Sequence, residues 1–199
     1  MNILLVEGNP RRLIEQGYPD YAQYFVDCLI TLDPSLSFQF AAPFEAPLLD
    51  ACLESINGAV FTGSSTASAT DAAEYKPQML AMERVFERGI PCWGSCAGLQ
   101  LAAVVLGGRV GASPNGVEVG LARDLVLTTA GQQHAMMRAR QGRKFAVPCI
   151  HRDEVRSYWQ QMLIHVCRHL PTMATVWIFG ARSITPNYRP VPLQGKPSA

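Results

Sequence analysis

A turn of small residues between an apolar strand and an apolar helix constrains this 199-residue chain more than any other feature. The turn has the sequence Gly94-Ser95-Cys96-Ala97-Gly98, and apolar residues precede it and follow it. A nucleophile on a sharp strand-to-helix turn needs small residues two positions before and two positions after it, because strand and helix pack closely there. Cys96 has glycines at both positions, whereas Ser95 would have Trp93 and Ala97. The pattern therefore predicts a nucleophile elbow with Cys96 at its tip.

The start of a helix also favours an ionised thiol at Cys96. Backbone N–H groups at a helix N-terminus stabilise a thiolate, so we expect the thiol pKa to lie below its usual value of about 8.5. The amide N–H of Ala97 can then point at an oxyanion. The alternative is a buried thiol in a glycine-rich turn, which is the usual role of a cysteine. The two glycines and the strand–helix frame favour the nucleophile.

Apolar strands alternate with amphipathic helices through the first half of the chain. Strands are expected at Asn2–Val6, Ser37–Ala41, Gly58–Thr62 and Ile90–Trp93, and later at Val117–Leu127 and Phe145–Ile150. Helices are expected at Tyr21–Leu32, Pro47–Ile56, Lys76–Arg88 and Cys96–Leu106, with a surface helix or loop at 130–143. This alternation predicts an α/β fold with an open, mostly parallel sheet and helices on both faces.

The composition changes near residue 155. We expect one α/β domain over residues 1–155 and an atypical segment over 156–199. The last part of that segment, 188–199, is rich in proline and basic residues, which predicts disorder.

Charge and cysteine usage exclude several functional classes. A net charge of +1 provides no electrostatic reason to expect nucleic acid or an anionic membrane as partner. The apolar segments are too short to span a membrane and the N-terminus lacks a signal-peptide pattern, so a cytoplasmic location is expected. The six cysteines are scattered and the four histidines dispersed, which favours free thiols and predicts neither a metal site nor a cofactor.

The segment Gly94-Ser95-Cys96-Ala97-Gly98-Leu99-Gln100 resembles the G-x-C-x-G-x-Q elbow of class I glutamine amidotransferases, whose fold is flavodoxin-like. The layout of residues 1–155 is similar to the glutaminase domain of GMP synthase. His151-Arg152-Asp153-Glu154-Val155 resembles the family's H-x-D-x-V segment, which is not itself catalytic. The resemblance implies that Gln100 helps to bind the substrate amino acid.

The resemblance also implies where the second oxyanion donor lies. In the family, a glycine-rich loop after an earlier strand supplies it, and Gly63 and Ser64 stand at that place here. Ser64 replaces the usual second glycine, so the donor depends on a backbone geometry that tolerates a side chain. The oxyanion residues implied by the resemblance are therefore Gly63, Ser64 and Ala97.

The family's reaction follows from these parts. The thiolate attacks the side-chain amide of glutamine, ammonia leaves, and water cleaves the resulting thioester. The substrate implied is glutamine, and the ammonia passes to an acceptor or synthetase partner that the sequence does not identify. A histidine oriented by a glutamate, in a His-Pro-Glu motif, must move the protons.

No His-Pro-Glu occurs in the sequence. The coding sequence can also be read in a frame shifted by one base, in which each codon begins with the last base of the preceding residue's codon. With permitted synonymous codons, Tyr158–Asn187 can then encode a sequence that ends in F-W-G-T-Q-Y-H-P-E. The codons of Thr185, Pro186 and Asn187 then specify the missing motif. We hypothesise that the tail is encoded in a shifted reading frame of an amidotransferase.

Two other functions fit the same residues. The chain could be a catalytically dead binding or regulatory protein that retains the elbow pocket without a base. It could also be another cysteine hydrolase of related fold, which would act on esters or other small acyl compounds and ignore glutamine.

Overall fold

The computed structural model describes residues 1–66, 69–114, 116–125, 143–157 and 176–178, and divides the chain into two units. The first unit contains residues 1–110 with 156–179, and the second contains 111–155 with 180–199. The predicted segment 156–199 lies mostly outside the described residues, so the domain division at residue 155 stays a prediction. Within the described chain, no helix has the length and apolarity to cross a membrane.

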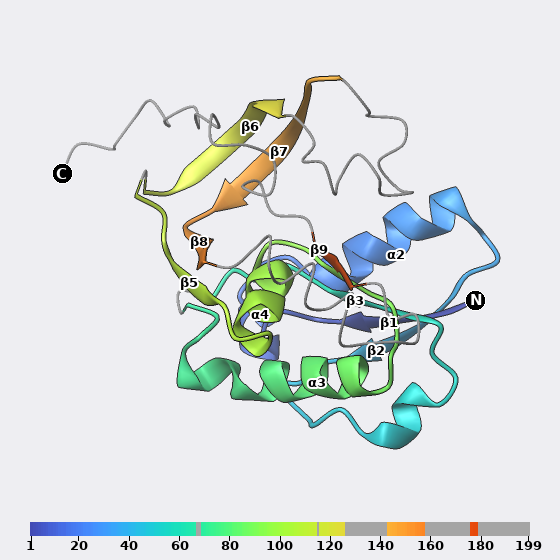
Figure 1. The fold of residues 1–199 in the computed structure, drawn as a ribbon. Coiled ribbons are helices and arrows are strands. Elements are labelled where there is room, and N and C mark those ends of the chain that lie inside the picture. The colour runs from blue at the N-terminus through green and yellow to red at the C-terminus, as the bar shows by residue number, and fades with distance from the viewer. Residues whose placement is uncertain (67–68, 115, 126–142, 158–175, 179–199) are drawn as a thin grey trace. The chain divides into compact units, whose positions relative to one another are not determined.

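A parallel sheet forms the centre of the first unit (Figure 1). Its strand order is β2-β1-β3-β4-β9, and each neighbouring pair is parallel. The strands are β1 (Asn2–Val6), β2 (Ser37–Ala41), β3 (Gly58–Phe61), β4 (Cys92–Gly94) and β9 (Val176–Ile178). Because the strands are parallel, their carboxyl ends meet at one edge of the sheet, where ligands of open α/β sheets bind.

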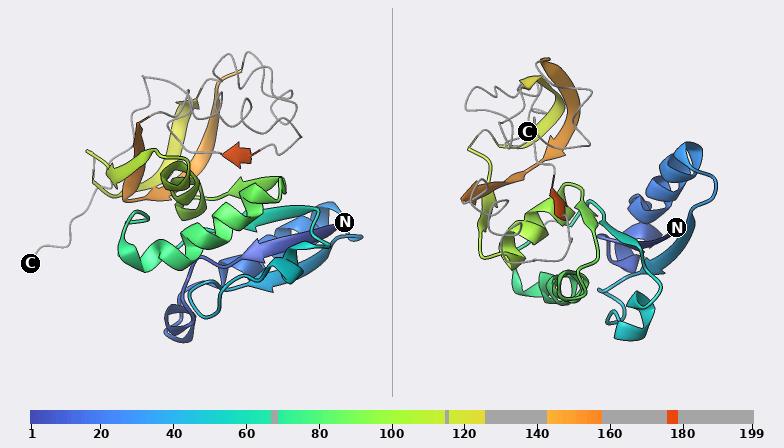
Figure 2. Two further views of the ribbon diagram at one scale, coloured as in Figure 1. Left: turned by 60° about the horizontal axis from the view of Figure 1, so that its bottom comes forward. Right: turned by 45° about the vertical axis from the view of Figure 1, so that its right-hand side comes forward.

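Helices cover both faces of this sheet, as the alternation of strands and helices predicted (Figure 2). The helices are α1 (Arg11–Glu15), α2 (Tyr21–Leu32), α3 (Lys76–Glu87) and α4 (Ala97–Val105), with short 3-10 turns η1 (Asp50–Leu53) and η2 (Ala73–Tyr75). The sequence pattern overestimated one helix: Pro47–Ile56 forms only the single 3-10 turn η1. The remaining helices in the described chain match their predicted bounds within one residue, except for α1, which the pattern did not predict.

Alternate residues of β1 divide the core into two layers. Leu4 and Val6 pack with side chains of α3 and α4, including Met82, Val85 and Leu101. Ile3 and Leu5 pack on the other face with Ala22 of α2 and its apolar neighbours. This period of two places a buried strand between two helical layers, and all four β1 side chains are 8% exposed or less.

The second unit contains an antiparallel pair, β6 (Glu118–Leu125) with β7 (Phe145–His151). Residues of both units form the strands β5 (Arg109–Ala112) and β8 (Asp153–Ser157), which pair with each other and which the sequence pattern did not predict. The predicted surface segment 130–143 lies almost entirely outside the described residues.

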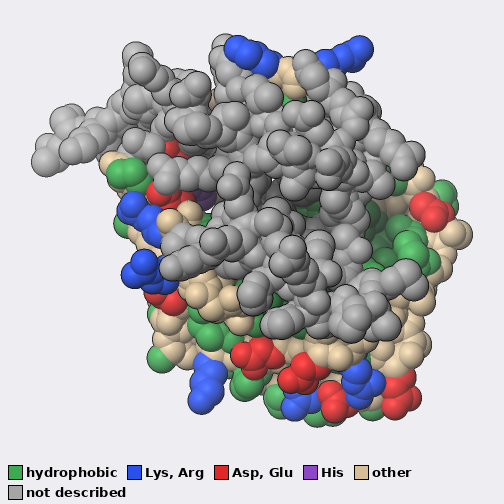
Figure 3. All heavy atoms as spheres, in the orientation of Figure 1, with side chains coloured by type: hydrophobic (Ala, Val, Ile, Leu, Met, Phe, Trp, Pro, Cys, Tyr) green, Lys and Arg blue, Asp and Glu red, His purple; other side chains and the backbone are tan. Residues whose placement is uncertain are grey.

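Charged side chains of both signs are interspersed on the face of the molecule in Figure 3. Within the first unit, Arg84 and Arg88 form ion pairs with Asp50, at 3.1 and 3.6 Å. The described part of that face therefore presents a mixed surface, in keeping with the near-zero net charge.

Candidate active site

Cys96 lies at the tip of the turn between β4 and α4, as predicted. Its backbone has φ 47° and ψ −104°, and among the described residues it is the one non-glycine with a positive φ. A side chain in this region is strained, which is the backbone signature of an exposed nucleophile at a strand-to-helix turn. The Cys96 side chain is exposed, whereas the Cys92 thiol is buried in the sheet.

Burial separates the chemistry of these two thiols. Desolvation raises the pKa of Cys92 to about 12, which keeps this thiol protonated and unreactive at neutral pH. Cys28, Cys52, Cys92 and Cys96, whose side chains the structure describes, form no disulfide.

The two glycines around Cys96 allow a close approach of backbone segments. A Cβ on Gly94 would stand 2.7 Å from the backbone carbonyl of Gly98, and a Cβ on Gly98 would stand 2.3 Å from the Phe61 carbonyl oxygen. Both distances are far below van der Waals contact. The requirement for small residues two positions before and after Cys96 is thus a packing requirement between β4, α4 and β3.

Hydrogen bonds connect the turn to the end of β3. Ser95 N–H donates to the Phe61 carbonyl at 2.9 Å, and Gly98 N–H donates to the Thr62 carbonyl at 3.0 Å. These bonds bring the turn beside Gly63, where an added Cβ would lie 3.6 Å from the Cys96 Cβ. The cysteine and the loop after β3, two sequence-predicted parts of the site, are therefore neighbours.

Two candidate oxyanion donors have no competing acceptor among the described residues. In that part of the chain, the amide N–H groups of Ser64 and Ala97 donate no hydrogen bond. An amide left without a protein partner beside a nucleophile is available to a developing negative charge. Contact of either amide with an oxyanion remains a prediction.

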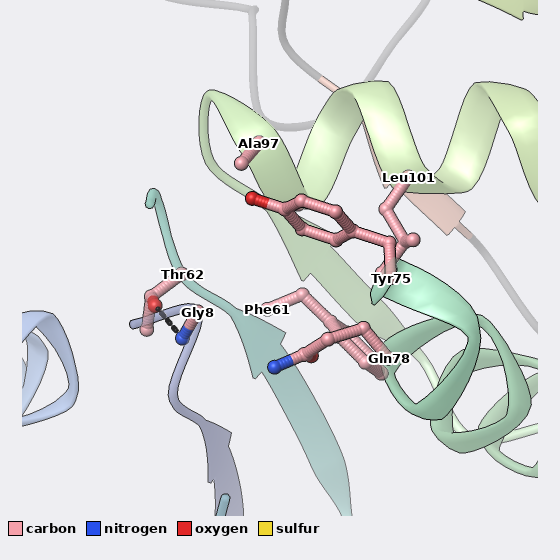
Figure 4. Close-up of a pocket in the computed structure, with 8 residues that line it drawn as sticks. Gly8, Phe61, Thr62, Tyr75, Gln78, Ala97 and Leu101 are labelled. Atoms are coloured by element: carbon pink, nitrogen blue, oxygen red, sulfur yellow. Dashed lines mark hydrogen bonds between the residues drawn. The ribbon is translucent and has the colours of Figure 1, made fainter. Parts of the chain in front are cut away.

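A small cavity lies beneath the turn (Figure 4). It measures about 10 Å³ and is lined by Gly8, Phe61, Thr62, Tyr75, Gln78, Ala97, Gly98 and Leu101. Such a volume is that of a single water molecule, whereas small-molecule sites are of the order of hundreds of Å³. This cavity is therefore too small to hold glutamine.

Gln100 lies one helical turn after Cys96, and its side chain is buried at 8% exposure. Its backbone N–H donates to the Cys96 carbonyl at 3.1 Å. The predicted role of Gln100 in substrate binding stays a prediction. No cluster of three or more His, Cys, Asp or Glu side chains that could hold a metal is found among the described residues.

The H-x-D-x-V segment lies in the second unit, at the end of β7 and in β8. His151 Nε2 is 2.9 Å from Glu118 Oε2 of β6, and both side chains are largely buried. This pairing joins the two strands of the antiparallel pair and provides a structural role for His151. The other three histidines, His134, His165 and His169, lie outside the described residues.

Glu7, at the end of β1, is a buried carboxyl group that no sequence motif marked. Its carboxylate accepts hydrogen bonds from the N–H groups of Asn9 at 2.7 Å and Ala22 at 2.6 Å. Burial raises the pKa of Glu7 to about 7, against the lowering effect of these two N–H groups and with a smaller upward contribution from Asp20. The buried carboxyl group thus carries a proton in the folded protein under mildly acidic conditions.

This proton makes stability depend on pH. Between pH 4.5 and about 7, Glu7 is protonated in the folded chain and ionised in the unfolded chain, so a rise in pH favours unfolding. We expect Glu7 to lower the free energy of unfolding by about 1–3 kcal/mol across this window. Urea denaturation of the wild type and of Glu7→Gln on both sides of the window measures this contribution. The change in the free energy of unfolding with pH is compared between the two proteins, because Glu7→Gln also alters the hydrogen bonds and hence the absolute stability. An equal decline with rising pH in both proteins would contradict the contribution of Glu7.

Comparison with known proteins places this geometry in a family. A family model described as glutamine amidotransferase class-I matches residues 41–174, which include both the loop after β3 and the cysteine turn. The chain belongs to the class I glutamine amidotransferase family. The family predicted from the elbow motif is therefore confirmed. No curated protein matched the chain.

Solved structures share the amidotransferase fold with this chain. A glutamine amidotransferase from Thermotoga maritima is 21% identical with a TM-score of 0.61, over 78% of this chain and 62% of that one. The glutaminase domain of Trypanosoma brucei CTPS, solved with bound acivicin, is 16% identical with a TM-score of 0.60, over 83% and 72%. A glutamine amidotransferase from Methylobacillus flagellatus is 20% identical with a TM-score of 0.55, over 78% and 56%.

These identities establish the fold and leave substrate and partner open. The chain covers less than two thirds of the length of the Thermotoga maritima and Methylobacillus flagellatus proteins. The predicted fold class, a mostly parallel α/β sheet of the class I amidotransferase type, is confirmed by both the topology and the family match.

Proposed function

We propose that this chain attacks the side-chain amide of glutamine with Cys96 and forms a γ-glutamyl thioester, releasing ammonia. The observation that carries the proposal is the strained, exposed backbone position of Cys96 beside Gly63. Membership of the class I glutamine amidotransferase family supports glutamine as the substrate. A cytoplasmic location and an acceptor or synthetase partner for the ammonia are further parts of the proposal.

The bonds in this reaction balance without a cofactor. The sulfur–carbon bond forms as the carbon–nitrogen bond of the amide breaks, and the thiol proton leaves with the nitrogen as ammonia. Water then adds to the thioester carbon and the sulfur–carbon bond breaks, which releases glutamate and restores the thiol. The amide N–H groups of Ser64 and Ala97 stabilise the oxyanion in both steps.

Proton transfer is the weak step in this chain, because the sequence contains no His-Pro-Glu. A positioned general acid and base contributes about 10²–10⁴-fold to such a reaction. This absence favours a second candidate function, a binding or regulatory protein that recognises glutamine without turning it over. It does not weaken the proposed attack by Cys96, which depends on the elbow.

An affinity label tests the proposal. A glutamine analogue in which a chloromethyl ketone replaces the carboxamide would bind as glutamine does and alkylate Cys96 with loss of chloride. We expect one adduct per chain by intact-mass spectrometry, protection by glutamine but not by asparagine, and no adduct on Cys96→Ala. Cys52→Ala is the matched control, since Cys52 is also exposed but lies outside the turn.

Three outcomes separate the candidate functions. Ammonia release together with glutamine-protected labelling supports the amidase. Protected labelling without ammonia release supports the binding protein. Labelling of Cys96 that glutamine leaves unchanged, together with cleavage of small esters, would contradict the proposal and favour another cysteine hydrolase.

A further inference from the structure

The loop after β3 is held by side chains from other parts of the first unit. Ser65 N–H donates to Asn9 Oδ1 at 2.7 Å, and the Ser64 hydroxyl donates to the same oxygen at 3.3 Å. On either side, the Tyr21 hydroxyl lies 3.0 Å from the Ser65 hydroxyl, and the Thr66 hydroxyl bonds to that of Tyr75. Asn9 is the member of this set that contacts the backbone of the loop.

Asn9 is itself fixed in place. Its side chain is 1% exposed, its Nδ2 donates to the Pro19 carbonyl at 2.9 Å, and its backbone N–H donates to Glu7 Oε1 at 2.7 Å. With both ends of the amide bonded, the side chain has one orientation, and its oxygen points at the loop. These bonds therefore fix the loop after β3 relative to the segment that follows β1.

The bonds from Asn9 meet the loop at Ser64 and Ser65. Ser64 has no positive φ, because Cys96 is the one described non-glycine residue with that backbone, so these bonds orient the peptide and do not offset strain at Ser64. Asn9 fixes the peptide that follows Ser64 and bonds the Ser64 hydroxyl, so that both bonds restrict the residue whose amide is the candidate oxyanion donor.

We propose that Asn9 is a positioning residue that holds the backbone of Gly63–Ser65 in the orientation required to bind the oxyanion. This inference rests on the proposed attack of Cys96 on an amide. Asn9 acts through the loop and does not touch the substrate.

Two labelling reactions on Cys96 test the role of Asn9. The chloromethyl ketone passes through a tetrahedral adduct whose oxyanion needs the loop, whereas iodoacetamide alkylates the thiolate by direct displacement. Asn9→Ala is expected to slow the first reaction about 10–100-fold, because a displaced donor loses most of its effect. It should change the iodoacetamide rate at Cys96, followed by peptide mass spectrometry, by less than about 3-fold.

Control variants keep the test decisive. Asn9→Asp retains an oxygen acceptor for Ser65 N–H but loses the Nδ2 donor to the Pro19 carbonyl, so it is expected to restore part of the ketone rate. Ser64→Ala removes the hydroxyl contact with Asn9 and also the bonds of that hydroxyl with Thr66. Thr66→Val leaves the Asn9 contact in place. If Asn9→Ala fails to fold, we expect Ser64→Ala, and not Thr66→Val, to slow the ketone reaction about 3-fold or more.

The results that would overturn the two proposals differ. The role of Asn9 would be overturned if Asn9→Ala slowed the ketone and iodoacetamide reactions equally. It would also be overturned if neither Asn9→Ala nor Ser64→Ala slowed either reaction. Failure of glutamine to protect the wild type from the ketone would instead overturn the proposed function, whatever the variants do.

Discussion

Replacing Gly98 with alanine is expected to lower the free energy of unfolding by about 3 kcal/mol or more, despite the helix position of this residue. On an unobstructed helix, Gly→Ala would raise stability by about 1 kcal/mol. Here the new Cβ would stand 2.3 Å from the Phe61 carbonyl oxygen, and a backbone atom cannot move aside as a flexible side chain can. The turn and β3 would have to separate, which breaks the core packing of Phe61.

Gly58→Ala is the matched control for Gly98→Ala. A Cβ on Gly58 would meet the tip of the Ile3 side chain at 3.3 Å, and this flexible group can shift by a few tenths of an ångström. We expect its effect to be within about 1 kcal/mol. Denaturant unfolding of the wild type and both variants provides the measurement. Gly98→Ala with wild-type stability would mean that α4 does not pack on β3 as described.

Restoring the family's reading frame after Val155 is expected to accelerate ammonia release from glutamine about 10²–10⁴-fold. In that frame the codons of Thr185, Pro186 and Asn187 encode His-Pro-Glu. A positioned histidine can then take the thiol proton and deliver it to the leaving nitrogen. The assay compares ammonia and glutamate production by the two chains, and Cys96→Ala in the restored chain should abolish both products.

The coding DNA decides whether the shifted reading frame with the His-Pro-Glu motif exists. A reading frame that continues from residue 150 through the codons of residues 158–187 and specifies the motif would support the frameshift hypothesis. Its absence, or a restored chain no faster than the present one, would contradict it. The family match extends to residue 174, so it covers part of the segment in question without testing the motif itself.

The sequence was sufficient to predict the elements that depend on local patterns. β1, β2 and α2 lie at the predicted bounds, because a buried strand and an amphipathic helix each have a regular spacing of apolar residues. The cysteine turn was also predictable, since its two glycines are required by contacts within a few residues of Cys96 and with the adjacent strand. The helix prediction for Pro47–Ile56 was wrong, because helical spacing over a few residues cannot distinguish one 3-10 turn from a helix.

The sequence by itself determined the family, the position of the cysteine turn and the alternation of strands and helices, because each depends on residue types at fixed short separations. Only the tertiary structure revealed that Asn9 and Glu7, at the end of β1, connect to the loop after β3 and to the start of α2. Those contacts join residues up to 56 positions apart. Parallel pairing of β1 with β3 brings their carboxyl ends together, and no local pattern records which polar side chains meet there.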